Sequence, residues 1–278
     1  MKKYLLLICM SLIAQKAFPF QYHFLNTETS RKEVLLLLKE AGVPEEDLKI
    51  WKTLVEKYYQ SIDFVNVTKK GWQNSGSTDD YFKKTFNWDG LFNCRMSCFL
   101  LVHGLVGLDK FQRKSNPMPH LENEIGSLKE ITGIELTDKE KDIYRSLFYG
   151  VTLPIQKIDD SIFEKTENFF QVWWKKEGFT FPQNENLKIV FVLIVEPQQK
   201  YASADHVALL LKKDKDLYLI EKPTYFSPPT VSKFESYEEL GEFLYEPFED
   251  WVEAKGEKGI AVMLNDKIVW KRIIGNQE

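Results

Sequence analysis

The sequence predicts an α+β fold. Helical periodicity fills most of the first 180 residues, and β-branched runs dominate after residue 186. We find no internal repeat, low-complexity tract or composition break between the two parts, so we expect a single domain, with a boundary near residue 180 as the alternative. With 278 residues, 44% of them hydrophobic, the chain can bury a core without disulfides.

The first residues have the features of a secretory signal peptide. Lys2 and Lys3 precede an apolar run over residues 4–14 that is too short to span a bilayer. We therefore expect a signal peptide over residues 1–17, cut between about residue 14 and about residue 20, and a domain over residues 18–278. The mature chain would lack a transmembrane span and lie in the periplasm, the cell envelope or outside a bacterium.

Capping signals and helical spacing predict the helices. Residues 30–33 have capping-box spacing and open a helix that ends at Gly42, and a second helix follows Pro44. Further helices are expected over residues 94–106, 137–149, 159–176 and 237–245. Residues 66–92 and 109–135 lack this pattern and are expected to be irregular, and a loop as long as residues 66–92 is often functional.

Five β-branched runs predict a C-terminal, mainly antiparallel five-stranded sheet. They cover residues 187–195, 207–211, 217–220, 259–264 and 267–274. We expect the second and third runs to form one hairpin and the last two another. The helix over residues 94–106 is apolar on every side, so it should be buried against this sheet.

Charge and motif content exclude several classes of function. The chain has 37 basic and 41 acidic residues and a formal charge of −4, which argues against nucleic acid as a partner. The Gly104–Gly107 segment is not followed by the Lys-Ser or Lys-Thr of a phosphate loop. A zinc site made of Cys94, Cys98 and His206 lacks a fourth ligand. We therefore expect neither a metal nor a cofactor.

Cys94 lies where a nucleophilic cysteine is readily activated. Asn93 is a plausible N-cap, so Cys94 falls in the first turn of its helix. There the helix dipole and the positive charge of Arg95 favour a thiolate. The first backbone N–H groups could stabilise an oxyanion, with the side-chain amide of Asn93 or Asn87 as a further donor.

His206 and Glu221 are the candidate base and its partner. His206 opens one strand of the expected hairpin and Glu221 closes the other. If Lys212 pairs with Leu217, Glu221 lies diagonal to His206 on the same face. If Lys212 instead belongs to the loop, the register shifts by one residue and the side chain of Glu221 points to the opposite face of the sheet.

Structural roles for the same residues are the alternatives. A cysteine in an apolar helix is usually a core residue, which we expect for Cys98 and keep open for Cys94. His206 could be a polar strand end, and Glu221 could be a solvated turn charge. The remaining histidines at positions 23, 103 and 120 are weaker candidates for catalysis.

The order of Cys, His and acid, with the Cys on a helix and the others on adjacent strands, is the papain-like arrangement. Over residues 25–272 the chain also resembles the bacterial domain-of-unknown-function family 4300. The matching segments are residues 93–95 (Asn-Cys-Arg), 206–210 (His-Val-Ala-Leu-Leu), 217–222 (Leu-Tyr-Leu-Ile-Glu-Lys), 233–234 (Lys-Phe) and 237–240 (Tyr-Glu-Glu-Leu). The chain departs from the family at residues 227–230, Ser-Pro-Pro-Thr, where a Pro-Tyr-Gln-like stretch is usual.

The family resemblance implies no reaction. The order of the three residues is similar to that of NlpC-type and transglutaminase-like members of the papain-like superfold, which implies thiol chemistry on amides. The leading hypothesis is an exported cysteine hydrolase or acyltransferase that acts on a peptidoglycan peptide or a protein, with Cys94, His206 and Glu221 as its triad. The alternatives are a non-catalytic envelope protein that binds through a papain-like scaffold, and an interaction module that uses the 66–92 loop.

Overall fold

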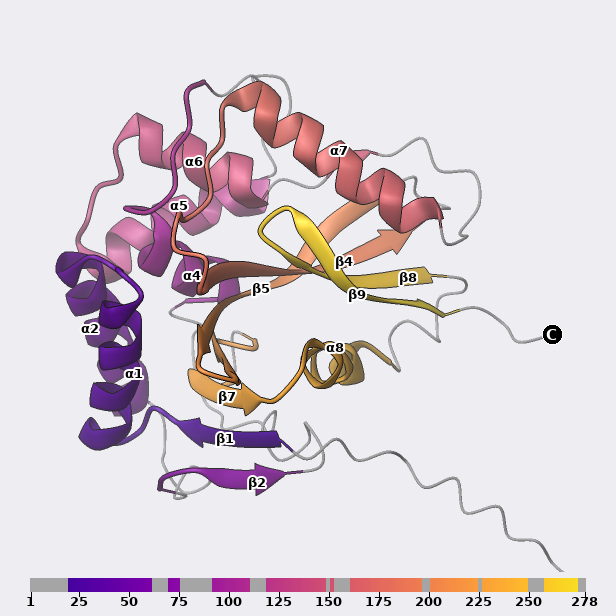
Figure 1. Ribbon diagram of the computed structural model, residues 1–278. Coiled ribbons are helices and arrows are strands. Elements are labelled where there is room, and N and C mark those ends of the chain that lie inside the picture. The colour runs from indigo at the N-terminus through magenta and orange to yellow at the C-terminus, as the bar shows by residue number, and fades with distance from the viewer. Residues whose placement is uncertain are drawn as a thin grey trace, which may run out of the picture.

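A computed structural model of the chain describes residues 20–61, 70–75, 92–110, 119–148, 151–152, 161–196, 201–224, 227–249 and 258–274 (Figure 1). The expected signal peptide over residues 1–17 lies outside these residues. In the part of the chain that is described, no helix is both long enough and apolar enough to cross a membrane.

One antiparallel sheet organises the molecule, and the α+β class is confirmed. Its strand order is β2 (Gln73–Ser75), β1 (Phe20–Phe24), β7 (Thr230–Phe234), β6 (Asp216–Glu221), β5 (Tyr201–Lys213), β4 (Leu187–Glu196), β8 (Lys258–Leu264) and β9 (Lys267–Ile274). A short strand, β3 (Val151–Thr152), pairs with β5 beside this order.

The expected number of five strands is too small. The five predicted runs correspond to β4, β5, β6, β8 and β9, and both expected hairpins form. The prediction missed β1, β2, β3 and β7 because these strands are short. Their pairing partners are also distant in sequence, as in the pairing of His23 with Val231.

The described residues contain seven α-helices. They are α1 (Glu28–Glu40), α2 (Glu45–Ser61), α4 (Cys94–Val102), α5 (Pro119–Thr132), α6 (Asp138–Phe148), α7 (Ser161–Glu177) and α8 (Tyr237–Tyr245), with a 3₁₀ turn η2 (Glu246–Phe248) after α8. Residues 109–135 are therefore not irregular throughout, because α5 occupies half of them. The helix expected over residues 94–106 ends at Val102.

The first helix begins earlier than predicted. Thr27 is its N-cap and accepts a hydrogen bond from the backbone N–H of Ser30, while the hydroxyl of Ser30 accepts one from the N–H of Thr27. Ser30 thus closes a capping box that Thr27 opens. The expected box starting at Ser30 is wrong because Thr27 supplies the same spacing three residues upstream.

The sheet curls around α8. This helix contacts β7, β8 and β9, which are well separated in the strand order, and Figure 1 shows it enclosed between β7 and the β8–β9 hairpin. On the other side of β4, helix α7 places Trp174 against Phe191, with ring centroids 5.6 Å apart. Helix α4 packs on β5, β6 and α2, which puts the start of α4 beside the β5–β6 hairpin.

Candidate active site

Cys94 is the first residue of α4. Asn93, with extended backbone (φ −108°), is the N-cap, and its side-chain Oδ1 accepts a hydrogen bond of 2.9 Å from the backbone N–H of Met96. The N-cap expectation for Asn93 is therefore confirmed. Cys94 is 8% exposed, so its sulfur lies at a buried helix start where unpaired backbone N–H groups and the helix dipole are concentrated.

The structure brings Cys94, His206 and Glu221 together as a thiol triad. The sulfur of Cys94 is hydrogen-bonded to His206 and receives a second hydrogen bond from the backbone N–H of Val207. The Nε2 atom of His206 lies 2.5 Å from Oε2 of Glu221, so Nδ1 is the ring nitrogen left available to Cys94. His206 and Glu221 are 6% and 3% exposed, so the alternative of a solvated turn charge at Glu221 is wrong.

The register of the β5–β6 hairpin explains why Glu221 reaches His206. Lys212 pairs with Leu217, and the same register places Glu221 across from Ala208, diagonal to His206. The turn is tighter than expected, since Lys213 and Asp216 also pair and Asp214 adopts a left-handed φ of 55°.

A β-bulge lies next to the triad. On β5 the pairing with β4 passes from Ala204 to His206, so Asp205 is the extra residue. Such a bulge changes the direction in which neighbouring side chains point. The described pairing of β5 with β6 begins at Leu209, and the segment before it is the part of β5 that contacts Cys94.

The environment of the triad favours a thiolate and an imidazolium. Burial acts to raise the pKa of Cys94, but the hydrogen bond and charge of His206, with the charge of Arg95, bring that pKa below its usual value. Burial acts to lower the pKa of His206, but hydrogen bonds to Cys94 and Glu221 raise it above its usual value. Each partner therefore stabilises the charged form of the other.

Cys98 contrasts with Cys94 in its contacts and in the direction of its pKa shift. It lies one turn further along α4, is buried, and its sulfur contacts the carbonyl oxygen of Ala208 at 3.5 Å. Burial, and then the negative charge of Cys94, raise its pKa. Both cysteines are free thiols, and the expectation that Cys98 is a core residue agrees with this position.

A buried carboxylate, Glu124 of α5, holds the start of α4. The side-chain amide of Asn93 donates to Glu124 at 2.5 Å, Nε of Arg95 donates to it at 2.9 Å, and the hydroxyl of Tyr144 donates at 2.6 Å. A second Arg95 nitrogen also contacts Glu124. Burial acts to raise the pKa of Glu124, and the hydrogen bonds and charge of Arg95 lower it, so the carboxylate stays ionised.

Because the side chains of Asn93 and Arg95 both donate hydrogen bonds to Glu124, we interpret these two residues as supports of the start of α4. Asn87, the other proposed oxyanion donor, lies outside the described residues. Sequence reasoning missed Glu124 because residues 109–135 were expected to be irregular. The available signal was the helical spacing of Leu121, Ile125 and Leu128, with Glu124 placed among them.

Lys222 is a second residue that sequence reasoning missed. It follows Glu221 directly and is 0% exposed. Its ammonium group donates to the carbonyl oxygens of Thr224 and Ser227 at 2.7 and 2.8 Å. The same nitrogen lies over the ring of Tyr58.

The remaining histidines take other positions. His23 is buried in β1, and His120 lies in α5 instead of the expected loop. His103 caps the end of α4, where its Nε2 lies 3.4 Å from Asp47. Across the described residues, no group of three or more His, Cys, Asp or Glu side chains is placed to hold a metal ion.

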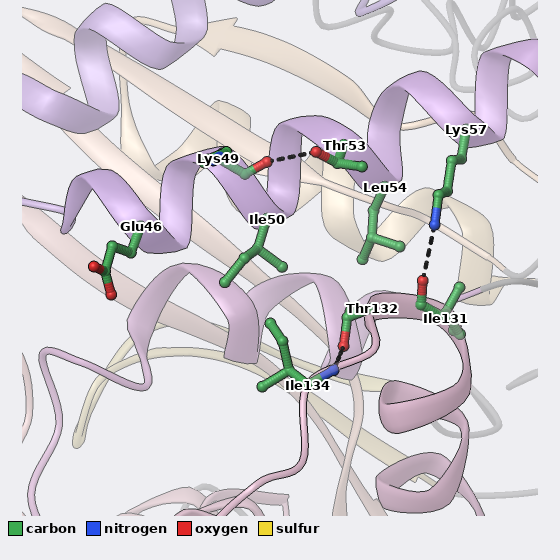
Figure 2. Close-up of a pocket in the computed structure, with 9 residues that line it drawn as sticks. All are labelled: Glu46, Lys49, Ile50, Thr53, Leu54, Lys57, Ile131, Thr132 and Ile134. Atoms are coloured by element: carbon green, nitrogen blue, oxygen red, sulfur yellow. Dashed lines mark hydrogen bonds between the residues drawn. The ribbon is translucent and has the colours of Figure 1, made fainter.

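A pocket of about 370 Å³ lies between α2 and the turn after α5 (Figure 2). Ile50 and Leu54 of α2 face Ile131 and Ile134 across it, and Nζ of Lys57 donates to the carbonyl oxygen of Ile131 at 3.1 Å. The thiol triad does not line this pocket, so any ligand bound there would not contact the triad directly.

Comparisons with known proteins place the chain in a family without a described reaction. Neither the curated proteins nor the solved structures contain a significant match. One family matches residues 21–269, the span that holds most of β1, the Asn-Cys-Arg helix start and the His-to-Glu hairpin. The chain therefore belongs to the family described as Domain of unknown function (DUF4300).

Proposed function

We propose that this protein is a cysteine hydrolase or acyltransferase that acts on amide bonds. The observation that carries the proposal is the buried hydrogen-bonded series from Cys94 through His206 to Glu221, with the sulfur at a helix start. A core cysteine needs no such partners, whereas an activated thiol nucleophile needs a base held by a third group. The proposal includes a papain-like arrangement of the triad and a single domain over residues 18–278.

The geometry supports a two-step reaction. The thiolate of Cys94 attacks the carbonyl carbon of the amide, and the tetrahedral intermediate collapses when Nδ1 of His206 gives its proton to the leaving amine. The product of this step is a thioester on Cys94. A water molecule, or an amine in a transferase, then gives a proton to His206 as it attacks the thioester, and the thiolate of Cys94 is released.

The supporting groups have separate tasks in this scheme. Glu221 orients His206 and stabilises its imidazolium form. The backbone N–H groups of Cys94 and Arg95 lie in the first turn of α4, where they lack partners within the helix and can donate to an oxyanion. Asn93 and Arg95 hold that turn in place through Glu124.

Export and an envelope substrate are part of the proposal. The basic start and apolar run of residues 1–17 support export, and a peptidoglycan peptide or a protein is the substrate class that an exported amidase would meet. A non-catalytic binding protein on the same scaffold is the competing function, and it differs from the proposal in the reactivity of Cys94.

Alkylation of the native protein tests the proposal. We expect iodoacetamide to label Cys94 at pH values well below the reference thiol pKa of about 8.5, because His206 stabilises the thiolate. Cys98 is the internal control and should stay unlabelled until denaturation. The label at each cysteine is read by peptide mass spectrometry across a pH series.

Two variants complete this experiment. His206→Ala should slow the labelling of Cys94 near neutral pH, and Cys94→Ala should abolish the release of new amines from peptidoglycan peptides or denatured protein. If Cys94 of the folded wild type reacts no faster than Cys98, the enzyme proposal is wrong and the binding protein takes its place.

A further inference from the structure

The side chain of Lys222 is fully buried although it ends in an ionisable amine. Two of its contacts are hydrogen bonds to the carbonyl oxygens of Thr224 and Ser227, which belong to the loop after β6. Two others are aromatic: its nitrogen lies 4.5 Å from the ring centroid of Tyr58 and 5.3 Å from that of Phe92. Buried amines need such partners, since desolvation of the charge is otherwise unfavourable.

These contacts connect three segments, two of which lead directly to residues of the triad. Lys222 itself follows Glu221, the partner of His206. Phe92 precedes Asn93 and Cys94, so it belongs to the chain that leads into α4. Tyr58 lies on α2, and its ring packs edge-on against Phe92 at 6.3 Å between centroids.

The loop after β6 is folded onto the same amine. The backbone N–H of Ser227 donates to the hydroxyl of Thr224 at 2.9 Å, and the two hydroxyl groups are also 2.9 Å apart. Glu221 pairs with Thr230 at the other end of this loop. A loop whose carbonyl oxygens converge on one buried amine depends on that amine for its conformation.

We propose that Lys222 is a positioning residue of the thiol triad: its buried amine ties the loop after Glu221 to the Phe92 segment, and so holds Glu221 and the start of α4 in place on either side of His206. The inference rests on the proposed function, since it assigns Lys222 to the same site. Lys222 acts through Glu221 and Cys94 and has no part in proton transfer.

The charges at the site agree with this placement. Burial lowers the pKa of Lys222 to about 7, while the negative charge of Cys94 acts to raise it. The amine and the thiolate therefore influence each other. The carbonyl oxygens and ring faces that contact the amine favour its protonated form.

Replacement by a side chain of similar length tests the proposal. Lys222→Met keeps an unbranched apolar side chain at this buried position and removes the N–H donors. We expect the labelling of Cys94 at neutral pH to fall roughly tenfold and its pH midpoint to rise. We also expect the far-downfield imidazole proton of His206, which reports its short hydrogen bond to Glu221, to weaken or shift in the proton NMR spectrum.

Lys233 offers a matched control. It lies on β7, pairs with Asp216 at 2.7 Å, and its amine lies 5.8 Å from the ring centroid of Tyr218. Lys233→Met thus removes a lysine with an ionic and an aromatic partner outside the triad. It should leave both the labelling profile of Cys94 and the imidazole proton of His206 unchanged.

A second variant keeps the test decisive if Lys222→Met does not fold. Thr224 is exposed, and Thr224→Ala loosens the loop without a change in the core. We expect it to shift the labelling of Cys94 in the same direction by a smaller factor. Folding of each variant is checked by circular dichroism before labelling.

The outcomes separate the two proposals. If wild-type Cys94 reacts no faster than Cys98, the proposed function fails. If the wild type and His206→Ala behave as expected, but the folded Lys222→Met variant keeps the wild-type pH midpoint and imidazole proton, the positioning role alone is overturned. When Lys222→Met does not fold, a Thr224→Ala variant that labels like the wild type overturns the positioning role instead.

Discussion

Two opposing effects act on the Cys94 sulfur. Burial of a thiol favours its neutral form, as at Cys98, where the pKa is raised. At Cys94 burial is again the largest single effect, but the hydrogen bond and charge of His206 and the charge of Arg95 together outweigh it, and the pKa is lowered. A separation of four positions on the same helix therefore divides an environment that favours the thiolate from one that favours the neutral thiol.

Removal of the negative charge of Glu221 should weaken the stabilisation of the His206 imidazolium, while a side chain of the same size stays beside the ring. Glu221→Gln keeps a hydrogen-bond acceptor near His206 but no longer stabilises the imidazolium, so the pKa of His206 should fall and that of Cys94 should rise. We expect the labelling of Cys94 at neutral pH to slow about tenfold, which corresponds to one unit of pKa. The measurement is the pH profile of iodoacetamide labelling.

Glu238→Gln serves as the control for this prediction. Glu238 is exposed in the first turn of α8, so the same chemical change there should leave the labelling of Cys94 unaltered. A folded Glu221→Gln variant with a wild-type profile would show that Glu221 does not influence the thiol.

At the scale of elements, α5 fixes the start of α4. Glu124 accepts hydrogen bonds from both residues that flank Cys94 and from Tyr144 of α6, so three helices meet at one carboxylate. A buried ion pair of this kind is costly to break, because the remaining partner keeps a charge without compensation.

Glu124→Gln should therefore destabilise the protein by about 2–3 kcal/mol at pH 7. The pKa of Glu124 is lowered in the folded state, so its contribution is present above its ordinary pKa and is lost as the pH falls through the folded value. The difference from wild type should shrink in acid. Urea unfolding at several pH values measures it.

Glu122→Gln is a matched comparison on the same helix. Glu122 pairs with Arg145 at 2.7 and 2.8 Å, but this pair is partly exposed. Its loss at pH 7 should cost less than about 1 kcal/mol. Equal losses for the two variants would contradict a special role of the buried pair.

The contact of α8 with the sheet depends on a glycine. A Cβ atom at Gly241 would lie 2.2 Å from Cγ of Trp270, so Gly241→Ala forces the ring or the helix to move. We expect a loss of about 1–3 kcal/mol from this overpacking. Gly126, in α5, has open space around its Cα, and Gly126→Ala should instead stabilise the protein by about 0.5–1 kcal/mol. Thermal unfolding of both variants tests the comparison.

In the whole molecule, segments far apart in sequence share one curved sheet. β1 pairs with both β2 and β7, which joins residues from Phe20 onward to the strand that follows Glu221. The buried side chains of Phe20 and Tyr22 pack there with Phe234. The loop that carries Lys222 thus connects the triad to β7, the strand that pairs with β1.

This pairing sets a downstream limit on the expected site of signal cleavage. A cut beyond Phe20 would remove residues that pair in β1, so we expect the mature N-terminus of the exported protein between about residue 15 and about residue 20. N-terminal sequencing of protein recovered from outside the cytoplasm measures it. An intact Met1 in that protein would contradict cleavage.

The sequence by itself determined the local parts of the site. Helix capping at Asn93 and the alternation of residues along the β5–β6 hairpin depend on neighbouring positions, so they predicted Cys94 at a helix start and the register that places Glu221 near His206.

Only the tertiary structure decided which charges are buried. The contact of Asn93 with Glu124 spans 31 positions of the sequence. Lys222 contacts the ring of Tyr58, which lies on a helix far away in the sequence. Composition and periodicity record the polarity of a residue and its place on an element, but its burial depends on which other elements pack against it. For that reason the sequence identified the candidate reacting groups, and the packing of α2, α5 and the loop after β6 revealed what holds them in place.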